Sequence, residues 1–516
     1  MYHHARNLTL DLDILILLLI VLDSPPTVIE TAYEIKYIGS RTDGVPVNPA
    51  KGSVTGATQP GAWCPQGMGV LLPFTSRVDN VSENCLSLRI ARSSGVKRHA
   101  RLPVAVWLHG GGHALGSASD ILYNPDGLVR GAAAARKPLI YVGINYRLGL
   151  FGFATSKAMV NTKQTNAGLR DQRAALQWVR DHIEAFGGDS NRGIIYLMTA
   201  IGQSVGNSDI GLQLTSFNSS RGMMSGTPKI NFNSDPGLVT NNTAAIARQV
   251  GCIRDNDGQS LETLECLRSV PAAILTSISV NVSRSAHRPS ELVRTGKVVK
   301  GIPIVASWVT NDGAWYASPQ TSTDEDVLGS FERWVCGLSE SMKEKLLQLY
   351  PVEEFGHMVR QDYDDEYARN GASKASQVWL YEHNATRFAP VYEAMGVPMW
   401  RVTHLSDIPY VFNNPHLEGG ADKSLGKLAL SETVSKAIIE FVHGGSPAAE
   451  GIGVQKWSSA SPARHEGQRS SESANRLSIQ IFGGSSNSSE VTIGRDEDVE
   501  RLFDRCDFTN GPQMRE

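Results

Sequence analysis

The stretch Ile194–Leu214, IIYLMTAIGQSVGNSDIGLQL, runs from an apolar segment through a glycine-bounded serine into a segment that can begin a helix. The apolar part, 194–201, is typical of a strand buried on both faces. Ser204 lies in Gly202-Gln203-Ser204-Val205-Gly206, a G-x-S-x-G pattern. A strand, a sharp turn and a helix form the setting of a nucleophile elbow, where the serine adopts a backbone conformation that most residues avoid. The pentapeptide alone does not separate a nucleophile from an ordinary serine in a glycine-rich loop.

Strands and helices are predicted to alternate along the rest of the chain. Apolar runs predict strands at 103–108, 138–146, 302–309, 377–383 and 477–482, and helical periodicity predicts helices at 171–186 and 428–443. Gly187 and Gly188 are expected to end the first helix. The alternation predicts an α/β fold with a mostly parallel central sheet and helices on both faces. The Ser-rich stretch 457–490 is expected to be a surface excursion before the last strand.

Composition narrows the class of protein. The chain has 516 residues, 41% of them apolar, with 49 Lys+Arg against 52 Asp+Glu and a net charge of −3. This balance argues against a nucleic-acid binder and against a polybasic membrane protein. The six cysteines show no zinc-type spacing, so we expect neither a metal nor an organic cofactor. Contact with a membrane surface and the oligomeric state are left open.

The N-terminal region favours secretion without settling it. Ile14–Leu22 has the length of a signal-peptide core and is too short to span a bilayer, although Asp11 and Asp13 precede it where positive charge is expected. A disordered N-terminus is the alternative. We therefore separate a divergent segment, 1–60, which is a candidate signal or signal-anchor region, from one α/β domain, 61–510. Glycosylation sequons, which are typical of secreted chains, occur at Asn7, Asn80, Asn218, Asn241, Asn281, Asn384 and Asn487.

A serine hydroxyl needs a base, a group that orients the base, and donors for the oxyanion. His109-Gly110-Gly111-Gly112 follows the strand at 103–108, and its glycine amides can turn towards a carbonyl oxygen. We expect Gly111, Gly112 and the Val205 N–H to be the donors, the alternative being a flexible glycine turn.

The acid and the base should follow the serine in chain order. Asp312 comes directly after the strand at 302–309 and is the candidate acid, although Asn-Asp-Gly is also a plain turn signal. His404 lies in a loop between apolar segments and is the candidate base. From periodicity alone, His383, His416 and His443 are rivals.

Longer strings resemble the type-B carboxylesterase/lipase family, which includes cholinesterases and many fungal esterases. The resemblance runs from about Trp63 to Pro447, through ENCLSLRI (83–90), HGGGHALGS (109–117), NYRLGLFGF (145–153), NAGLRDQRAALQWVRDHIEAFGGD (166–189), GQSVG (202–206), NDGAW (311–315) and THLSDIPYVF (403–412). It implies an α/β-hydrolase fold and a serine esterase or lipase that acts on small-molecule esters. It also implies the triad Ser204, Asp312 and His404.

The same resemblance implies that Cys64 pairs with Cys85 and Cys252 with Cys266, and it offers no partner for Cys336 or Cys506. The chain departs from the family's pattern at 24–60, where its usual N-terminal strings are missing, and at 285–294 and 363–376, which look shortened. In the family, the last two regions help to build the lid and the acyl pocket. The alternatives to an esterase are therefore a catalytically silent cholinesterase-like binding or adhesion domain and an inactive truncated variant.

Overall fold

The computed structural model describes a set of ranges that covers most of the predicted elements. They are residues 14–19, 60–67, 78, 80–93, 96–97, 99–189, 198–215, 236–253, 257–279, 303–310, 323–332, 339–349, 377–414, 422, 424–447, 454, 457–460, 476–484 and 488–494. Statements below refer to these ranges.

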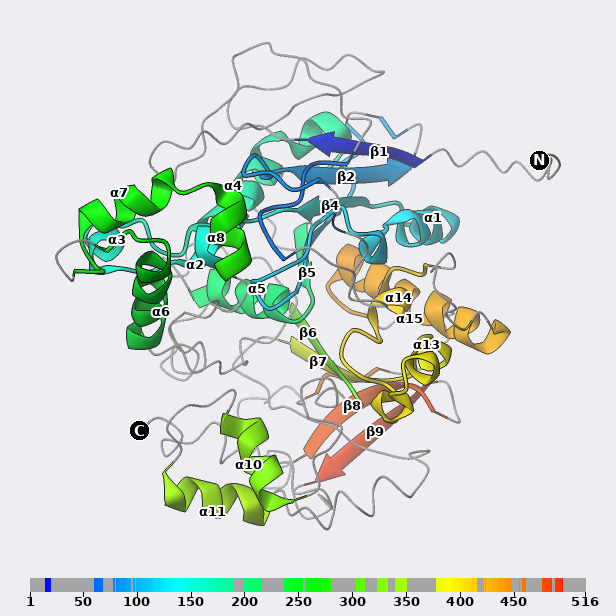
Figure 1. The fold of residues 1–516 in the computed structure, drawn as a ribbon. Coiled ribbons are helices and arrows are strands. Elements are labelled where there is room, and N and C mark those ends of the chain that lie inside the picture. Colours follow the sequence, from blue (N-terminus) through cyan, green and yellow to red (C-terminus); the bar gives the residue numbers. More distant parts are fainter. Residues whose placement is uncertain are drawn as a thin grey trace, which may run out of the picture.

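The described strands form two sheets, in the orders β1-β2-β4-β3-β5 and β6-β7-β8-β9 (Figure 1). Pairing is parallel where β3 joins β4 and β5 and where β7 joins β6 and β8. It is antiparallel for β1 with β2, β2 with β4, and β8 with β9. The strands are β1 (Ile14–Leu19), β2 (Leu88–Ser93), β3 (Val104–Leu108), β4 (Ile140–Ile144), β5 (Met198–Gly202), β6 (Pro303–Val309), β7 (Gln377–Asn384), β8 (Arg476–Gly483) and β9 (Ser488–Gly494).

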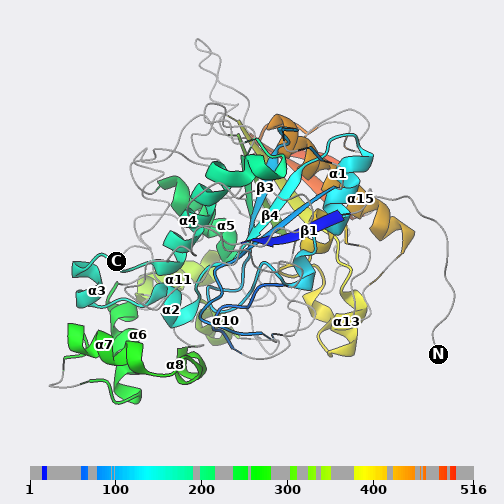
Figure 2. The ribbon, with the colours of Figure 1, turned by 90° about the horizontal axis from the view of Figure 1, so that it is seen from above.

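Helices cover both faces of the first sheet, as predicted. Figure 2 shows α4 and α5 on one side of β3 and β4, with α1 and α15 on the other. The helices up to residue 215 are η1 (Ile121–Tyr123), α1 (Asp126–Ala134), α2 (Gly149–Phe153), α3 (Lys157–Asn161), α4 (Ala167–His182), η2 (Ile183–Phe186) and α5 (Val205–Thr215). The remainder are α6 (Pro236–Gln249), α7 (Leu261–Ser269), α8 (Ala272–Ser279), α10 (Asp324–Glu332), α11 (Glu340–Leu349), α13 (Ala389–Ala394), η6 (Pro398–Trp400), α14 (Ile408–Val411) and α15 (Leu425–Gly444).

Strand β3 is buried on both faces, which is why its residues read as a continuous apolar run. Val104, Val106 and Leu108 pack in one core with Trp178 and Val179 of α4. Ala105 and Trp107 point to the opposite face and pack in a second core with residues of α1, α14 and α15. The alternation of side chains along the strand therefore joins the two helical layers through the sheet.

The predicted end of α4 is confirmed. The helix passes into the 3₁₀ turn η2, and Gly187 caps that turn with φ 88°, a left-handed conformation that favours glycine.

Both predicted disulfides are present, Cys64–Cys85 and Cys252–Cys266. The apolar run that the sequence suggests as a signal core contributes β1, which pairs with β2 at the sheet edge. Cys336 and Cys506 lie outside the described residues.

The prediction of a surface excursion from 457 is wrong at its beginning. Trp457 and Ala460 are buried. The Trp457 indole donates a hydrogen bond to Leu380 O at 3.1 Å, and Ala460 N donates to Val378 O at 2.7 Å. These contacts attach the stretch to β7, because one large aromatic ring outweighs the serine-rich composition around it.

Within the described ranges, none of the helices has both the length and the apolar character needed to traverse a bilayer.

Candidate active site

Ser204 lies at the turn between β5 and α5, in the setting that the sequence predicts. Its φ is 55°, a left-handed conformation that is unusual for a residue other than glycine. The turn is closed by Gly206 N, which donates to Gln203 O at 2.9 Å, and by Asn207 N, which donates to Ser204 O at 3.0 Å. The serine is therefore held at a sharp strand-to-helix turn by the first turn of the helix that follows it.

The two glycines of the pattern are needed for close approach. A Cβ on Gly202 would lie 2.5 Å from the carbonyl carbon of Gly206, and a Cβ on Gly206 would lie 2.2 Å from Leu108 O. Real Cβ atoms do not tolerate such distances to backbone atoms. Glycine at these positions therefore lets α5 start immediately beside β5 and against the end of β3.

The glycine loop that follows β3 lies directly against this turn. A Cβ on Gly110 would lie 3.0 Å from Ser204 Cβ and 2.4 Å from Gln203 Oε1. Gly111 and Gly112 have φ values of 107° and 64°, which other residues rarely adopt. The structure thus brings the two predicted donor segments together, and the donor roles of Gly111, Gly112 and Val205 remain a prediction.

Buried polar side chains hold both ends of the loop. The Tyr146 hydroxyl donates to His109 O at 2.6 Å at its start. Near its end, Gln66 donates to Gly116 O at 3.0 Å and accepts from Gly116 N at 2.8 Å. Asn145 Oδ1 accepts from Ala118 N at 2.8 Å. Sequence reasoning did not assign these supporting roles, although Asn145 and Tyr146 stand in one of the strings that carried the resemblance.

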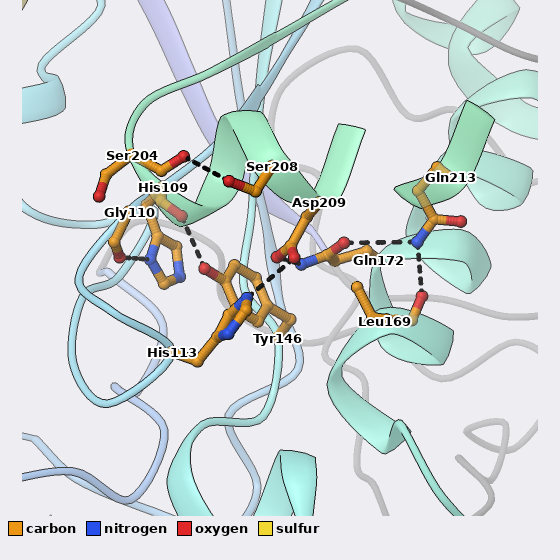
Figure 3. A network of polar contacts seen from close by, with 10 residues as sticks. All are labelled: His109, Gly110, His113, Tyr146, Leu169, Gln172, Ser204, Ser208, Asp209 and Gln213. Atoms are coloured by element: carbon orange, nitrogen blue, oxygen red, sulfur yellow. Dashed lines mark hydrogen bonds and ion pairs between the residues drawn. The ribbon is translucent and has the colours of Figure 1, made fainter. Parts of the chain in front are cut away.

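A buried pair joins the middle of the loop to α5 (Figure 3). His113 Nε2 lies 2.8 Å from Asp209 Oδ1, and Asp209 Oδ2 accepts from Gln172 Nε2 of α4 at 2.5 Å. The Asp209 side chain is fully buried. Its position in the second turn of a helix packed against β3 is the signal that could have identified it, since a carboxylate in such a place needs partners.

His404 comes to the same turn from a distant part of the chain. Its imidazole Nε2 lies 3.1 Å from the side-chain nitrogen of Gln203, the residue before Ser204. A general base in a serine hydrolase takes the serine proton on Nε2 while its Nδ1–H faces the acid, and the role of His404 as that base remains a prediction.

The rival histidines that the structure describes lie elsewhere. His383 is fully buried in β7, with its ring centroid 4.4 Å from that of Tyr410. Burial first, and nearby Lys427 second, lower the pKa of His383 to about 3. His443 lies on α15, and its Nε2 is 2.9 Å from Lys137 O. His416 lies outside the described residues.

His109, the first residue of the glycine loop, is a neutral structural histidine. Burial lowers its pKa to about 4. Nδ1 of the neutral ring carries the proton, because the Gly110 carbonyl oxygen, 2.9 Å away, can only accept a hydrogen bond. The ring stacks on Tyr146 with a centroid distance of 4.4 Å.

Asp312 lies outside the described residues, and its strand can be located. Strand β6 ends at Val309 and pairs in parallel with β7. A cavity of about 50 Å³ lies between β6, β7, α14, α15 and the elbow. Its walls are Trp107, Ile201, Gly202, Gln203, Asn207, Val305, Ser307, Tyr381, Asp407, Ile408, Val411, Ile438 and Phe441. Residues of the elbow, of β6 and of the His404 loop thus share one small space.

Among the residues that the structure describes, no three His, Cys, Asp or Glu side chains are grouped as a metal site would require.

Comparison with known proteins identifies the family. The profile of the carboxylesterase family matches residues 45–327. An inactive carboxylesterase-like protein, VdtD, of Byssochlamys spectabilis is 30% identical over 465 residues, which cover 76% of this chain and 79% of that protein. A secreted lipase of Arthroderma benhamiae is 26% identical, covering 91% of this chain and 88% of the relative. The para-nitrobenzyl esterase of Bacillus subtilis is 27% identical, covering 87% and 88%.

Solved structures agree in fold. A thermophilic PNB esterase superposes with a TM-score of 0.68 at 24% identity, covering 92% of this chain and 95% of that one. A further PNB esterase gives a TM-score of 0.65 at 25% identity, covering 89% and 92%. The fold is the α/β-hydrolase fold that the resemblance implied. The chain belongs to the carboxylesterase family.

Proposed function

We propose that the protein is a serine hydrolase that cleaves carboxylic esters through an acyl-enzyme intermediate. The observation that carries the proposal is the strained turn at Ser204, with φ 55°, beside which His404 Nε2 reaches the Gln203 side chain at 3.1 Å. A strained serine whose neighbour in the chain contacts an imidazole has a direct use in acyl transfer. Membership of a family that contains named esterases and lipases supports the same reaction.

In the proposed mechanism, His404 Nε2 takes the hydroxyl proton as Ser204 Oγ attacks the ester carbonyl carbon. Asp312 holds the imidazole in its Nδ1–H tautomer and stabilises the imidazolium. The N–H groups of Gly111, Gly112 and Val205 bind the tetrahedral oxyanion. The imidazolium then protonates the leaving alcohol, and water repeats the sequence to release the acid and free Ser204. These steps need no metal or organic cofactor.

Hydrolysis of p-nitrophenyl acetate and butyrate by the purified chain tests the proposal. Ser204→Ala should lower kcat by roughly 10⁴–10⁶, and Asp312→Asn by roughly 10⁴. Ser208→Ala is the matched control, because Ser208 lies one turn along α5 and only donates to Ser204 O at 3.4 Å. Equal rates for the unaltered chain and Ser204→Ala would end the proposal.

One relative favours a second candidate function, a folded but catalytically silent member of the family, since the protein of Byssochlamys spectabilis is named inactive. A fluorophosphonate probe separates the two candidates. An active esterase is labelled once, on the peptide that contains Ser204. A silent member shows a cooperative unfolding transition but neither labelling nor hydrolysis.

We also propose that the protein acts outside the cell, because it has two disulfides and a secreted lipase among its relatives. Asn80 and Asn241 are exposed and are the described sequons open to glycosylation, whereas Asn384 is half-buried in β7. The other sequons, at Asn7, Asn218, Asn281 and Asn487, lie outside the described residues. A shift in mobility after endoglycosidase treatment that Asn80→Gln and Asn241→Gln together reduce would support the proposal. Secreted protein whose mobility does not change after endoglycosidase treatment would contradict glycosylation at these sites.

A further inference from the structure

His113 is held unusually firmly for a residue in a glycine loop. It follows Gly112 directly and has φ 59°, a conformation that disfavours a side chain. Its ring stacks on Phe153 of α2 at a centroid distance of 4.2 Å and an interplanar angle of 27°. Its carbonyl accepts from Gly149 N at 2.7 Å. Side chain and backbone are thus fixed together by neighbouring elements.

The contact with Asp209 is the one that links the loop to the nucleophile's helix. Asp209 lies five residues after Ser204 on α5, and its side chain is fully buried. A carboxylate in such surroundings must be paired, and each of its oxygens accepts one side-chain donor, from His113 at 2.8 Å and from Gln172 at 2.5 Å. Charge-assisted hydrogen bonds of this kind are among the stronger ones in proteins.

The pair spans the two segments that carry the proposed oxyanion donors. The Val205 N–H belongs to α5, together with Asp209, while Gly111 and Gly112 belong to the loop with His113. We infer that His113 and Asp209 are positioning residues that fix the loop amides relative to the elbow, an inference that rests on the proposed esterase function. Neither side chain needs to touch the substrate.

The effect should fall on the chemical step. Oxyanion donors act when they lie 2.7–3.1 Å from the developing oxyanion, and a displacement of about 1 Å can lower a rate by about 10². The loop has other anchors, at Tyr146 and at Gln66, so a variant of His113 should fold with the loop ends in place. Losing the middle anchor should therefore lower kcat by roughly 10–100-fold and change KM by less than about threefold.

The test uses His113→Phe, which keeps an aromatic ring to stack on Phe153 but removes the donor to Asp209. The readouts are kcat and KM on p-nitrophenyl butyrate and the Kd of a trifluoromethyl ketone, whose tetrahedral adduct with Ser204 needs the oxyanion donors. The variant should lose kcat and ketone affinity by similar factors. His113→Gln, which restores an N–H donor, should recover part of both.

Gln213→Met is the matched control. Gln213 lies at the far end of the same polar network and donates to Gln172 Oε1 at 3.4 Å and to Leu169 O at 2.8 Å (Figure 3). Its loss should lower the free energy of unfolding without changing kcat. A general loss of stability is thereby separated from a loss of positioning.

A double-mutant cycle with Asp209→Asn completes the experiment. If the contact itself positions the loop, His113→Phe/Asp209→Asn should lose no more kcat than the worse single variant. If the kcat losses of the two single variants multiply in the double variant, the inference is overturned. It is also overturned if His113→Phe keeps the kcat and ketone affinity of an active parent chain. Either result leaves the esterase proposal standing. A parent chain that neither hydrolyses ester nor takes the fluorophosphonate label would overturn both.

Discussion

Replacing Gly206 by alanine would probe how closely α5 must approach β3. A Cβ at this position would lie 2.2 Å from Leu108 O and 2.7 Å from His109 O. Ordinary contacts of this kind are nearer 3.5 Å, so the helix and the strand end must separate by about 1 Å. Overpacking of this type lowers the free energy of unfolding by about 1–3 kcal/mol.

The same displacement should reach the chemistry. Ser204 and Val205 move with α5, while the glycine loop stays with β3. A shift of about 1 Å between nucleophile and oxyanion donors predicts a fall in kcat of about 100-fold in Gly206→Ala, with a smaller change in KM.

Gly426→Ala provides a matched control on another helix. Gly426 lies in α15, is exposed, and a Cβ there would meet no atom within 4 Å. Because alanine favours the helix over glycine, this variant should gain about 0.5–1 kcal/mol in unfolding free energy and keep full activity. Urea titration and p-nitrophenyl butyrate kinetics measure both quantities. A Gly206→Ala protein with the stability and kcat of the parent chain would refute the reasoning from close approach.

Further predictions concern pH, a disulfide and the base. His383 has a folded pKa of about 3, below its ordinary value of about 6.5, so the unfolded chain binds a proton at this residue before the folded protein does as the pH falls. Lowering the pH from 7.5 to 5 should therefore reduce the free energy of unfolding by about 2 kcal/mol. Urea titrations at the two pH values should show this loss in the parent chain and not in His383→Leu. Removing Cys64–Cys85, whose cysteines are 21 positions apart, with the double variant Cys64→Ser/Cys85→Ser should lower the free energy of unfolding by about 2–4 kcal/mol. A denaturant midpoint unchanged by the substitution would contradict this. Gln203→Leu removes the side-chain amide that contacts His404 Nε2 at 3.1 Å and helps to place the imidazole ring. It should lower kcat about tenfold at constant KM, the worth of about 1 kcal/mol, whereas an unchanged kcat would deny Gln203 an orienting role.

Local sequence signals predicted the elements that fix the elbow. The helical periodicity of 171–186 and the glycines after it predicted α4 and its end, because both signals act within a few residues. The glycine spacing around Ser204 predicted the turn for the same reason. The resemblance to a family was needed for His404, which lies 201 positions from Gln203.

Contacts between distant polar residues were beyond sequence reasoning. His113 and Asp209 are 96 positions apart, and Gln66 and Gly116 are 50 apart. Nothing in the local pattern of either partner indicates the other, because a polar residue in a loop or on a helix is usually solvated. Burial turns these side chains into obligatory partners, and only the tertiary structure reveals it.

Residues with positive φ occur in each of the three segments that make up the proposed site. His113, Ser204 and Leu405 have φ values of 59°, 55° and 75°, and they belong to the glycine loop, the elbow and the His404 loop respectively. Each such residue costs about 1–3 kcal/mol and persists where surrounding contacts impose it.

The cost at the elbow can be measured. Ser204→Gly removes both the hydroxyl and the strain of a side chain at positive φ, so it should abolish hydrolysis while raising the free energy of unfolding by about 1 kcal/mol. Ser208→Gly, at an ordinary helical position on α5, should instead lower stability by about the same amount and keep Ser204 active. If both glycine variants were destabilised alike, Ser204 would carry no strain, and the structural case for a nucleophile at this turn would lose its main support.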